Sequence, residues 1–540
     1  MPQARERLAL LALLTALTIV VTFPQITHLS TGVHDFGDPL LNAWALAWTP
    51  HAVVSQPASL FDANIFHPER GTLALSETLI APAMLTAPLR TLGANAILLH
   101  NLTLMSGFVL SGAAMFMLVR SLTADWRAAL VAAVAFTVTP LRLEHYPRVQ
   151  LQLTYLMPVT LYFVHRIVDG DTRKGAAIAA GLSCGLLFYS NVYFFTFFAT
   201  LLPLIVALPL VANRARLRAI AARFGIAALV TAAAVVPAAV PYLHNRSTVG
   251  ERHIEELRHG SAELRDYRRS HPINWLHGDW RRVGPAERHL FPGYVVSAAA
   301  LAAAASPIVR WIPYAAALAA SVELSLGING RAYQWLHAYA LPYRAMRVPA
   351  RAAMLAHMML AVLAGLGITA LLRRLQSPRA RNVVMVALLT GVVLESVNRP
   401  LVLRDMPSGV PAVYEWLRAQ PDGPIVEYPV GSLEGRSGPQ DATYMYYSTW
   451  HWRRMLNGYS GFSPPSYHAV LYELRDFPDP RSLAYLRQRE VRYLLVHERF
   501  YLQGGFDRDI EWLSRAANVA LRGVFRDAAL GRSHVYELLK

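Results

Sequence analysis

Apolar runs dominate the chain from its N-terminus to about residue 397, and charged and proline-rich segments dominate the remainder. The first run, from Leu8 to Phe23, ends at Pro24. A helix of about 20 apolar residues crosses the ~30 Å hydrocarbon core of a bilayer, so the repeated runs predict about eleven transmembrane helices. Two of them have only Ser190 and Asn191 between them, and two flank Arg310. The others are expected at about 8–23, 97–119, 128–140, 151–168, 224–242, 350–371 and 383–397.

Arginine and lysine residues in the short loops predict the orientation of these helices. Arg5 and Arg7 precede the first run, Arg173 and Lys174 follow the fourth, and the cluster 214–223 and the arginines of 373–381 follow later ones. Short basic loops stay in the cytoplasm, so we expect a cytoplasmic N-terminus and a C-terminal segment outside. The first run lacks a small-residue cleavage site, so we expect it to be retained. Long outer loops are predicted at 24–96, 244–292 and 327–349.

The segment after residue 397 has a different pattern. GPIVEYPV, VRYLLVH and SHVYELL are typical of short strands, whereas AVYEWLRAQ and DIEWLSRAANVA are typical of helices. We therefore predict two parts: a polytopic α-helical membrane domain at 1–397 and a small soluble α/β domain at 398–540. The aromatic stretch YMYYSTWHWRRMLNGYSGF lies between the strands. It suits either sugar stacking or packing against another surface.

Composition narrows the class further. The chain has 54% hydrophobic and only 16% charged residues, which is too apolar for a soluble protein of this length. The net charge of +16 comes from arginines in membrane-flanking loops, which favours anionic lipid or phosphate over nucleic acid as a partner. The single cysteine, Cys184, excludes an intramolecular disulfide and a cysteine-rich metal site. The sequence has no nucleotide-binding glycine loop, zinc spacing or nucleophile elbow.

Two carboxylates, Asp35 and Asp38, follow the first run within the segment THLSTGVHDFGDPLLNAWALAW. After them an apolar stripe carries Trp44 and Trp48, as expected of a helix lying in the membrane interface. Asp38 suits the N-cap of a helix that begins at Pro39. That role does not account for Asp35, and carboxylates at a lipid surface also suit chemistry on a lipid-borne substrate.

Further charged residues lie in the predicted outer loops. Arg347 and Arg351 are four residues apart, so they share one helix face if the helix begins early, and two arginines can bind a phosphate bidentately. The alternatives are arginines that extend to lipid headgroups and charged turns held by salt bridges. The candidate substrate-binding residues are Glu77, Glu144, His145, Arg148, Glu287, Arg347 and Arg351.

The segments GDPLLNAWALAW, FHPERGTL, ERHLFPG and YRAMRVPAR resemble a group of bacterial multi-spanning proteins within the GT-C superfamily of membrane glycosyltransferases. The resemblance covers the membrane domain well and the C-terminal segment loosely. It implies a polyprenyl-phosphate sugar donor, inverting transfer, and an active-site acidic residue in the first outer loop. In this chain that residue is Asp35 or Asp38. Phe36 and Gly37 separate the two carboxylates, which are adjacent in some members, and this leaves the choice between them open.

These inferences predict a glycosyltransferase at the outer face of the bacterial cytoplasmic membrane. It would move a hexosyl or pentosyl group from the lipid-phosphate donor to an envelope glycan, lipid or protein, with an acidic residue as base. The expected partners are this donor, membrane lipids and the acceptor, with no nucleic acid. No cofactor is assigned, and a divalent ion (Mg²⁺ or Mn²⁺) stays open. The alternatives are a lipid or polysaccharide transporter, an envelope-assembly scaffold, and a transferase fold without turnover.

The predicted topology can be tested with reporter fusions. A reporter fused after Lys540 should be active only outside the cytoplasm, and one inserted near Arg216 only inside it, because short basic loops stay in the cytoplasm. Alkaline phosphatase and green fluorescent protein activities measure the two sides. Activity of the same reporter type at both positions would contradict the eleven-helix count.

Overall fold

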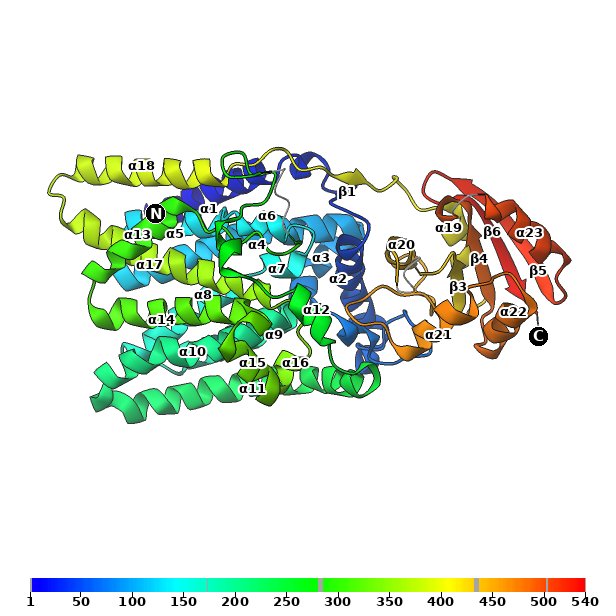
Figure 1. The fold of residues 1–540 in the computed structure, drawn as a ribbon, viewed down its shortest axis with the longest axis horizontal. Coiled ribbons are helices and arrows are strands. Elements are labelled where there is room, and N and C mark those ends of the chain that lie inside the picture. The colour runs from blue at the N-terminus through cyan, green and yellow to red at the C-terminus, as the bar shows by residue number, and fades with distance from the viewer. Residues whose placement is uncertain (1, 172, 280–284, 432–436, 502–503, 540) are drawn as a thin grey trace. The chain divides into compact units, whose positions relative to one another are not determined.

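The computed structural model describes residues 2–171, 173–279, 285–431, 437–501 and 504–539, and most of them are helical. The chain folds into two compact units that are interleaved in sequence (Figure 1). The first, here called the helical unit, comprises 1–26, 103–238 and 251–401. The second, here called the sheet unit, comprises 27–102, 239–250 and 402–540. The predicted outer loop 244–292 includes 280–284, which lie outside the described residues.

Each predicted transmembrane run coincides with a helix. Among the described residues, five helical segments are long and apolar enough to cross a membrane: Ala96–Thr123, Trp126–Glu144, Val192–Ala212, Arg214–Val249 and Pro349–Arg373. The full count of eleven stays a prediction. The corresponding helices are α1 (Pro2–Val21), α4 (Ala96–Thr123), α5 (Trp126–Thr137), α8 (Leu156–Val168), α9 (Lys174–Ser190), α10 (Val192–Ala212), α11 (Leu217–Val249), α13 (Tyr294–Leu301), α14 (Ile308–Ser325), α17 (Ala353–Arg373) and α18 (Pro378–Ser396).

Helix α17 is the centre of the helical unit. Most of its residues are buried, and it packs against α5, α13 and α14. A side chain on Gly367 would overlap the backbone of Ala299, and one on Gly365 would overlap Val119. Small residues therefore allow the close approach of neighbouring helices that membrane bundles use in place of a hydrophobic driving force.

Polar side chains satisfy the helix ends at three breaks in the apolar pattern. The Asp125 carboxylate accepts hydrogen bonds from two backbone N–H groups at the start of α5, and Asn191 caps α10 through Phe194 N at 2.7 Å. Glu395 accepts from Tyr294 N and Val295 N, each at 3.0 Å, at the start of α13. The interruption at Asn191 in the sequence is therefore a helix cap.

Short helices connect the longer ones. In the helical unit these are α6 (Leu141–Glu144), α7 (Val149–Gln152), α12 (Ile254–His259), α15 (Arg331–Tyr339) and α16 (Leu341–Arg344), with a 3₁₀ turn at Pro349–Ala352. The sheet unit contains α2 (Asp38–Ser55), α3 (Ile80–Thr91), α19 (Ala412–Arg418), α20 (Pro439–Ser448), α21 (Pro465–Glu473), α22 (Pro480–Gln488) and α23 (Gly505–Arg515).

The sheet unit has a mixed four-stranded sheet in the order β3-β4-β6-β5. Strands β3 (Ile425–Tyr428) and β4 (Tyr493–His497) are parallel, and β6 (Gly531–Leu538) is antiparallel to β4 and to β5 (Val519–Asp527). The three predicted strand segments form β3, β4 and β6. Strand β5 was not predicted, because it is a partly exposed edge strand with a register shift at Gly523 and no clear apolar alternation.

Helix α2 lies in the core of the sheet unit, so its two indoles pack inside the protein and not against lipid as the apolar stripe indicated. Trp44 and Trp48 are 1% and 2% exposed, and their indole N–H groups donate to Asn64 Oδ1 at 3.1 Å and Leu60 O at 2.9 Å. The helix packs against α3 and α20. Its indoles therefore have partners inside the unit, which a stripe pattern alone does not reveal.

The first outer loop and the C-terminal segment form this unit together. Met455 N donates to Asn64 O at 2.8 Å, His67 N donates to Met455 O at 2.8 Å, and Phe66 N donates to Asn457 O at 3.0 Å. The short strands β1 (Gly32–Val33) and β2 (Arg404–Asp405) pair as well. By packing, the C-terminal segment is therefore continuous with residues 27–102, whereas the predicted division at 397 separates them.

The aromatic stretch contributes three tyrosine rings to the core of the sheet unit. Tyr444, Tyr446 and Tyr447 are at most 4% exposed and belong to the core around α2 and β3. These three rings are consequently inaccessible to a sugar. Of the two roles that the sequence left open for this stretch, packing is the one that these tyrosines fulfil.

Gly458 gives a test of this packing. A Cβ at Gly458 would overlap the ring of Phe66, so we expect Gly458→Ala to destabilise the sheet unit by about 1–3 kcal/mol, the usual cost of overpacking a core. Thermal unfolding of the purified protein measures the change. The matched control is Gly505→Ala, where the nearest atom would lie at 3.5 Å and the substitution should be tolerated. Equal unfolding midpoints for the two variants would contradict the contact.

Candidate active site

The predicted site residues lie in two groups, one in each unit. Asp35, Asp38 and Glu77 belong to the sheet unit. The helical unit holds the remaining six, Glu144, His145, Arg148, Glu287, Arg347 and Arg351. Each group is described by itself.

Asp35 and Asp38 lie on either side of Gly37 at the start of α2. Tyr459 Oη donates to Asp38 Oδ1 at 3.3 Å, and Gly37 N donates to Asp35 Oδ1 at 2.8 Å. A Cβ on Gly37 would lie 3.1 Å from Tyr459 Oη and 3.2 Å from Asp35 Oδ1, so the absence of a side chain lets the three groups approach one another. The result is a small polar cluster of two carboxylates and one phenol.

The expected capping role of Asp38 is wrong. Helix α2 begins at Asp38 itself, and its N-cap residue is Gly37, which has no side chain to make a cap hydrogen bond. Asp38 is the first residue of the helix, where a carboxylate interacts favourably with the helix dipole.

Asp35 remains accessible to solvent. Its side chain is 42% exposed, and His34 Nδ1 lies 3.5 Å from Asp35 Oδ2. The bond from Gly37 N forms a local turn of the kind that aspartate favours before a helix. The backbone thus orients the carboxylate, which is partly exposed to solvent.

Glu77 lies between the 3₁₀ turn at Thr72–Leu75 and α3, where it is partly buried. The neighbouring Ser76 carbonyl accepts a hydrogen bond from Tyr242 Oη at 3.1 Å. Residues 239–250 thus contact the first outer loop within the sheet unit.

In the helical unit, Glu287 is the centre of a buried ion cluster. Arg351 donates to both of its carboxylate oxygens, from Nε at 2.7 Å and from Nη2 at 3.0 Å. Arg148 Nη2 lies 3.4 Å and His145 Nδ1 3.6 Å from the same carboxylate. Glu287 adopts a left-handed backbone with φ of 65°, which is uncommon for a residue with a side chain and occurs preferentially at functional sites.

Glu144 joins this cluster to the turn that follows α5. Its carboxylate accepts from Glu287 N and lies 2.6 Å from His289 Nδ1. The neighbouring Arg142 is 1% exposed and donates to the carbonyls of Phe136 and Gln152. The turn is consequently held by hydrogen bonds on both sides.

Burial and neighbouring charges determine the protonation states of Glu287 and His145 in this cluster. Burial raises the pKa of Glu287, but Arg351 and Arg148 lower it more, so the net pKa lies well below the ordinary value of a glutamate. Burial lowers the pKa of His145 to about 4, a shift that Glu287 opposes and Arg351 reinforces. At neutral pH the cluster therefore holds an ionised Glu287 beside a neutral His145.

Arg347 and Arg351 do not share a helix face, so this expectation is wrong. Pro349 disfavours a helical conformation for Val348, and α17 begins only at Ala353. Arg347 lies in the preceding loop, where its backbone N–H donates to Tyr193 Oη at 2.7 Å. Its guanidinium has no carboxylate partner among the residues that the structure describes. Arg351, by contrast, is 6% exposed and engaged by Glu287.

Among the described residues, no group of three or more histidine, cysteine or acidic side chains could hold a metal ion. Asp35 and Asp38 supply carboxylate oxygens, the donor type that Mg²⁺ prefers. A divalent ion there would need further ligands from water or from a substrate phosphate.

Three residues beside the predicted ones were not predicted as site residues. Tyr459 donates to Asp38, His289 pairs with Glu144, and the ring of Tyr193 lies 4.8 Å from the Arg351 guanidinium. His289 lies two residues after Glu287 in the sequence and could have been included on that basis. Tyr459 and Tyr193 are distant in sequence from their partners, so only the fold identifies them.

Comparison with known proteins identifies the fold. No protein-family model matches the sequence, and no curated protein matches it either. The mycobacterial arabinofuranosyltransferase AftD superposes with a TM-score of 0.63 at 14% identity, over 99% of this chain and 40% of the AftD chain. The archaeal oligosaccharyltransferase AglB from Archaeoglobus fulgidus gives a TM-score of 0.47 at 12% identity, over 92% of this chain and 70% of that chain.

The protein therefore shares its fold with the AftD structure over nearly its whole length. It spans about two fifths of the AftD chain, so the correspondence with AftD is one of fold over part of a larger protein.

The buried cluster predicts different effects on stability when Arg351 and Arg347 are substituted. Arg351→Gln leaves Glu287 buried without its main partner, and breaking such a pair typically costs about 3–5 kcal/mol. Arg347→Gln removes a guanidinium without a carboxylate partner and should leave the unfolding temperature within error of the wild type. Thermal unfolding in detergent measures both. Equal midpoints for the two variants would contradict a stabilising role of the Glu287–Arg351 pair.

Proposed function

We propose that the protein is a glycosyltransferase that moves a hexosyl or pentosyl group from a polyprenyl-phosphate donor to an envelope acceptor at the outer face of the membrane. The observation that carries the proposal is the pair Asp35 and Asp38, which flank Gly37 at the start of α2 in the first outer loop of a GT-C-type fold, with Tyr459 donating to Asp38. This is the position at which the family resemblance implies an active-site acid.

The reaction we propose is a single inverting displacement. The acceptor oxygen attacks the anomeric carbon and forms the new glycosidic bond, while the bond from that carbon to the lipid-phosphate oxygen breaks. Its electron pair stays on the phosphate. The proton of the acceptor hydroxyl passes to the carboxylate of Asp38 or Asp35, and general-base help of this kind is typically worth ~10²–10⁴-fold.

Tyr459 supports Asp38 as the base over Asp35. Its hydroxyl orients the Asp38 carboxylate at 3.3 Å, whereas Asp35 accepts a hydrogen bond from a backbone N–H group. In this assignment Asp35 orients the acceptor or contributes to binding a divalent ion.

Arg347 is the proposed partner of the donor phosphate. Leaving-group charge needs a cation, and Arg347 has a guanidinium that no described carboxylate engages. Arg351 has the role of holding Glu287 instead, with Glu144, His145 and Arg148 forming its surroundings. Glu77 stays a candidate for acceptor binding.

A transporter is less consistent with the placement of the charges. Transporters carry ionisable residues near the middle of their spans and are built from repeats. Here Glu144 and Arg351 lie at the ends of the apolar segments Trp126–Glu144 and Pro349–Arg373.

The proposed base can be tested by Asp38→Asn. Asparagine keeps the size of the side chain and can still accept from Tyr459, so the variant should unfold at the wild-type temperature but lose transfer by ~10²-fold or more. Mass spectrometry of lipid-linked sugars and envelope glycans measures transfer. Asp476→Asn, an exposed carboxylate of the same unit, is the control. Wild-type transfer by the variant that carries both Asp35→Asn and Asp38→Asn would contradict the proposal.

The proposed phosphate contact can be tested by Arg347→Ala and Arg347→Lys. Alanine should raise the KM for a polyprenyl-phosphate sugar, and lysine should restore activity only in part because it lacks the planar fork. Kinetics of the purified protein with a lipid-linked donor measure both. A KM unchanged in the alanine variant would exclude Arg347 as the phosphate partner.

A further inference from the structure

A cavity of about 220 Å³ lies at the end of α17 that is opposite to Arg351. It is lined by residues of α17, by the turn between α13 and α14, and by the last residue of α4, Thr123. Because α17 has 21 residues, its two ends are roughly 30 Å apart. The cavity is therefore separate from the Glu287 cluster within the same unit.

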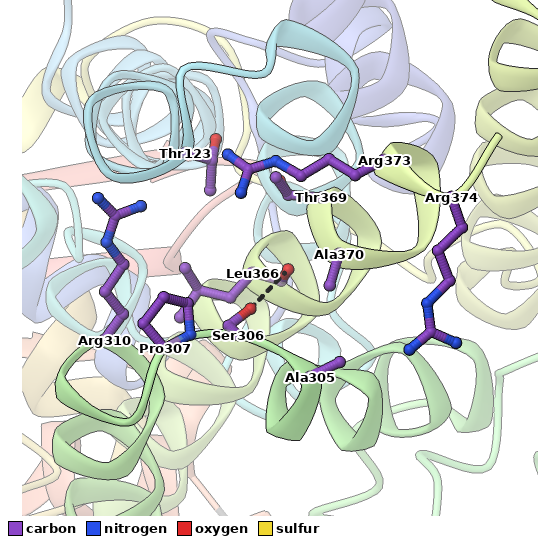
Figure 2. A pocket seen from close by; sticks show the side chains of 10 residues that line it. All are labelled: Thr123, Ala305, Ser306, Pro307, Arg310, Leu366, Thr369, Ala370, Arg373 and Arg374. Atoms are coloured by element: carbon purple, nitrogen blue, oxygen red, sulfur yellow. Dashed lines mark hydrogen bonds between the residues drawn. The ribbon is translucent and has the colours of Figure 1, made fainter. Parts of the chain in front are cut away.

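Three arginines surround this cavity. Figure 2 shows the guanidinium groups of Arg310 and Arg373 on the side of Thr123 and that of Arg374 on the other side. None of the three has an ion-pair partner within the part of the chain that the structure describes. The charge of Arg310 acts on the carboxylate of Asp169, but Asp169 is not among the residues that line the cavity.

The surroundings position one arginine and leave the others available. Arg310 Nη1 donates to Leu122 O at 3.1 Å, which fixes its side chain while other guanidinium N–H groups remain. The backbone of α14 begins at Ile308 beside the cavity without a side-chain cap, so its first N–H groups add partial positive charge. Thr369 lines the wall but donates its hydroxyl proton to Gly365 O, at 2.9 Å.

The three positively charged guanidinium groups around the cavity repel one another, and the attraction of each to an anion in the cavity would offset this repulsion. We propose that this cavity is a binding site for a phosphate group, carried either by the headgroup of an anionic lipid or by free phosphate. Arginine recognises the planar arrangement of phosphate oxygens through paired N–H donors. The cavity volume suits a headgroup rather than a sugar chain. The short basic loops around Arg310 and Arg373 are those predicted to be cytoplasmic.

The site is distinct from the proposed transferase chemistry. Its residues are not among those assigned to donor, acceptor or base, so its variants should leave the KM for the sugar donor unchanged. The expected consequence of occupancy is stabilisation of the contacts among α4, α14 and α17, since a ligand that binds only the folded state raises its stability.

The experiment uses the full-length protein in detergent, titrated with phosphatidylglycerol or phosphatidylcholine and analysed by native mass spectrometry. Inorganic phosphate against chloride at equal ionic strength forms a second arm, analysed by thermal unfolding. The variants are Arg310→Gln, Arg373→Gln and their combination. The matched control is Arg379→Gln, an exposed arginine on the predicted cytoplasmic side that does not line the cavity.

We expect the wild type and Arg379→Gln to retain phosphatidylglycerol over phosphatidylcholine. Each single variant should weaken retention about fivefold and the pair about thirtyfold, because one arginine near a charged surface contributes about 1 kcal/mol. Stabilisation by inorganic phosphate without lipid preference would support free phosphate as the source.

Equal retention by wild type and the double variant, with no effect of phosphate on either, would overturn the proposal. An equal loss in Arg379→Gln would also overturn it, since the effect would then reflect general surface charge. If the double variant does not fold, Arg374→Gln replaces it, because Arg374 is exposed and flanks the other side of the cavity.

Discussion

The ion pair of Glu287 and Arg351 is the interaction on which the arrangement of the helical unit depends. Both side chains are almost fully buried, where an isolated charge would cost far more than any single contact in the unit returns. The pair is tolerated because Arg351 meets both oxygens of Glu287 and because Arg148 and His145 surround them. This requirement fixes the turn before α17 and the loop before α13 in one geometry.

Buried polar groups that need hydrogen-bond partners also hold the sheet unit together, but here the groups are neutral. The indoles of Trp44 and Trp48 need acceptors because α2 is buried, and Asn64 and Leu60 supply them. Asn64 also donates to Ser448 Oγ and Arg453 O, so one amide connects the first outer loop to the C-terminal segment.

The buried triad of His497 with Ser533 and Glu427 resembles a catalytic arrangement, but all three side chains are inaccessible to solvent, so it is a structural network.

The sequence predicted features that depend on local pattern and missed those that depend on distant contacts. Apolar runs predicted where the helices lie, and alternating residues predicted β3, β4 and β6. The charged residues Glu144, His145, Arg148, Glu287 and Arg351 were all identified, because ionisable groups beside membrane spans are costly unless they are paired. Their mutual pairing was not predictable, since Glu144 and Glu287 are brought together only by the fold. The same holds for Tyr459 beside Asp38, and for α2, whose apolar stripe is equally compatible with a lipid surface and with a protein core.

The interleaving of the two units also constrains biosynthesis. The first part of the sheet unit ends at residue 102, and its largest partner begins at residue 402, some 300 residues later. At translation rates of about 5–20 residues per second, residues 27–102 wait roughly 15–60 seconds for that partner. During this interval Trp48 and Phe66 lack Trp452 and Tyr467, the rings that later pack against them. In the nascent chain these apolar side chains are therefore exposed while the later transmembrane helices are being inserted. This is the stage of synthesis at which a chaperone or insertase would bind them.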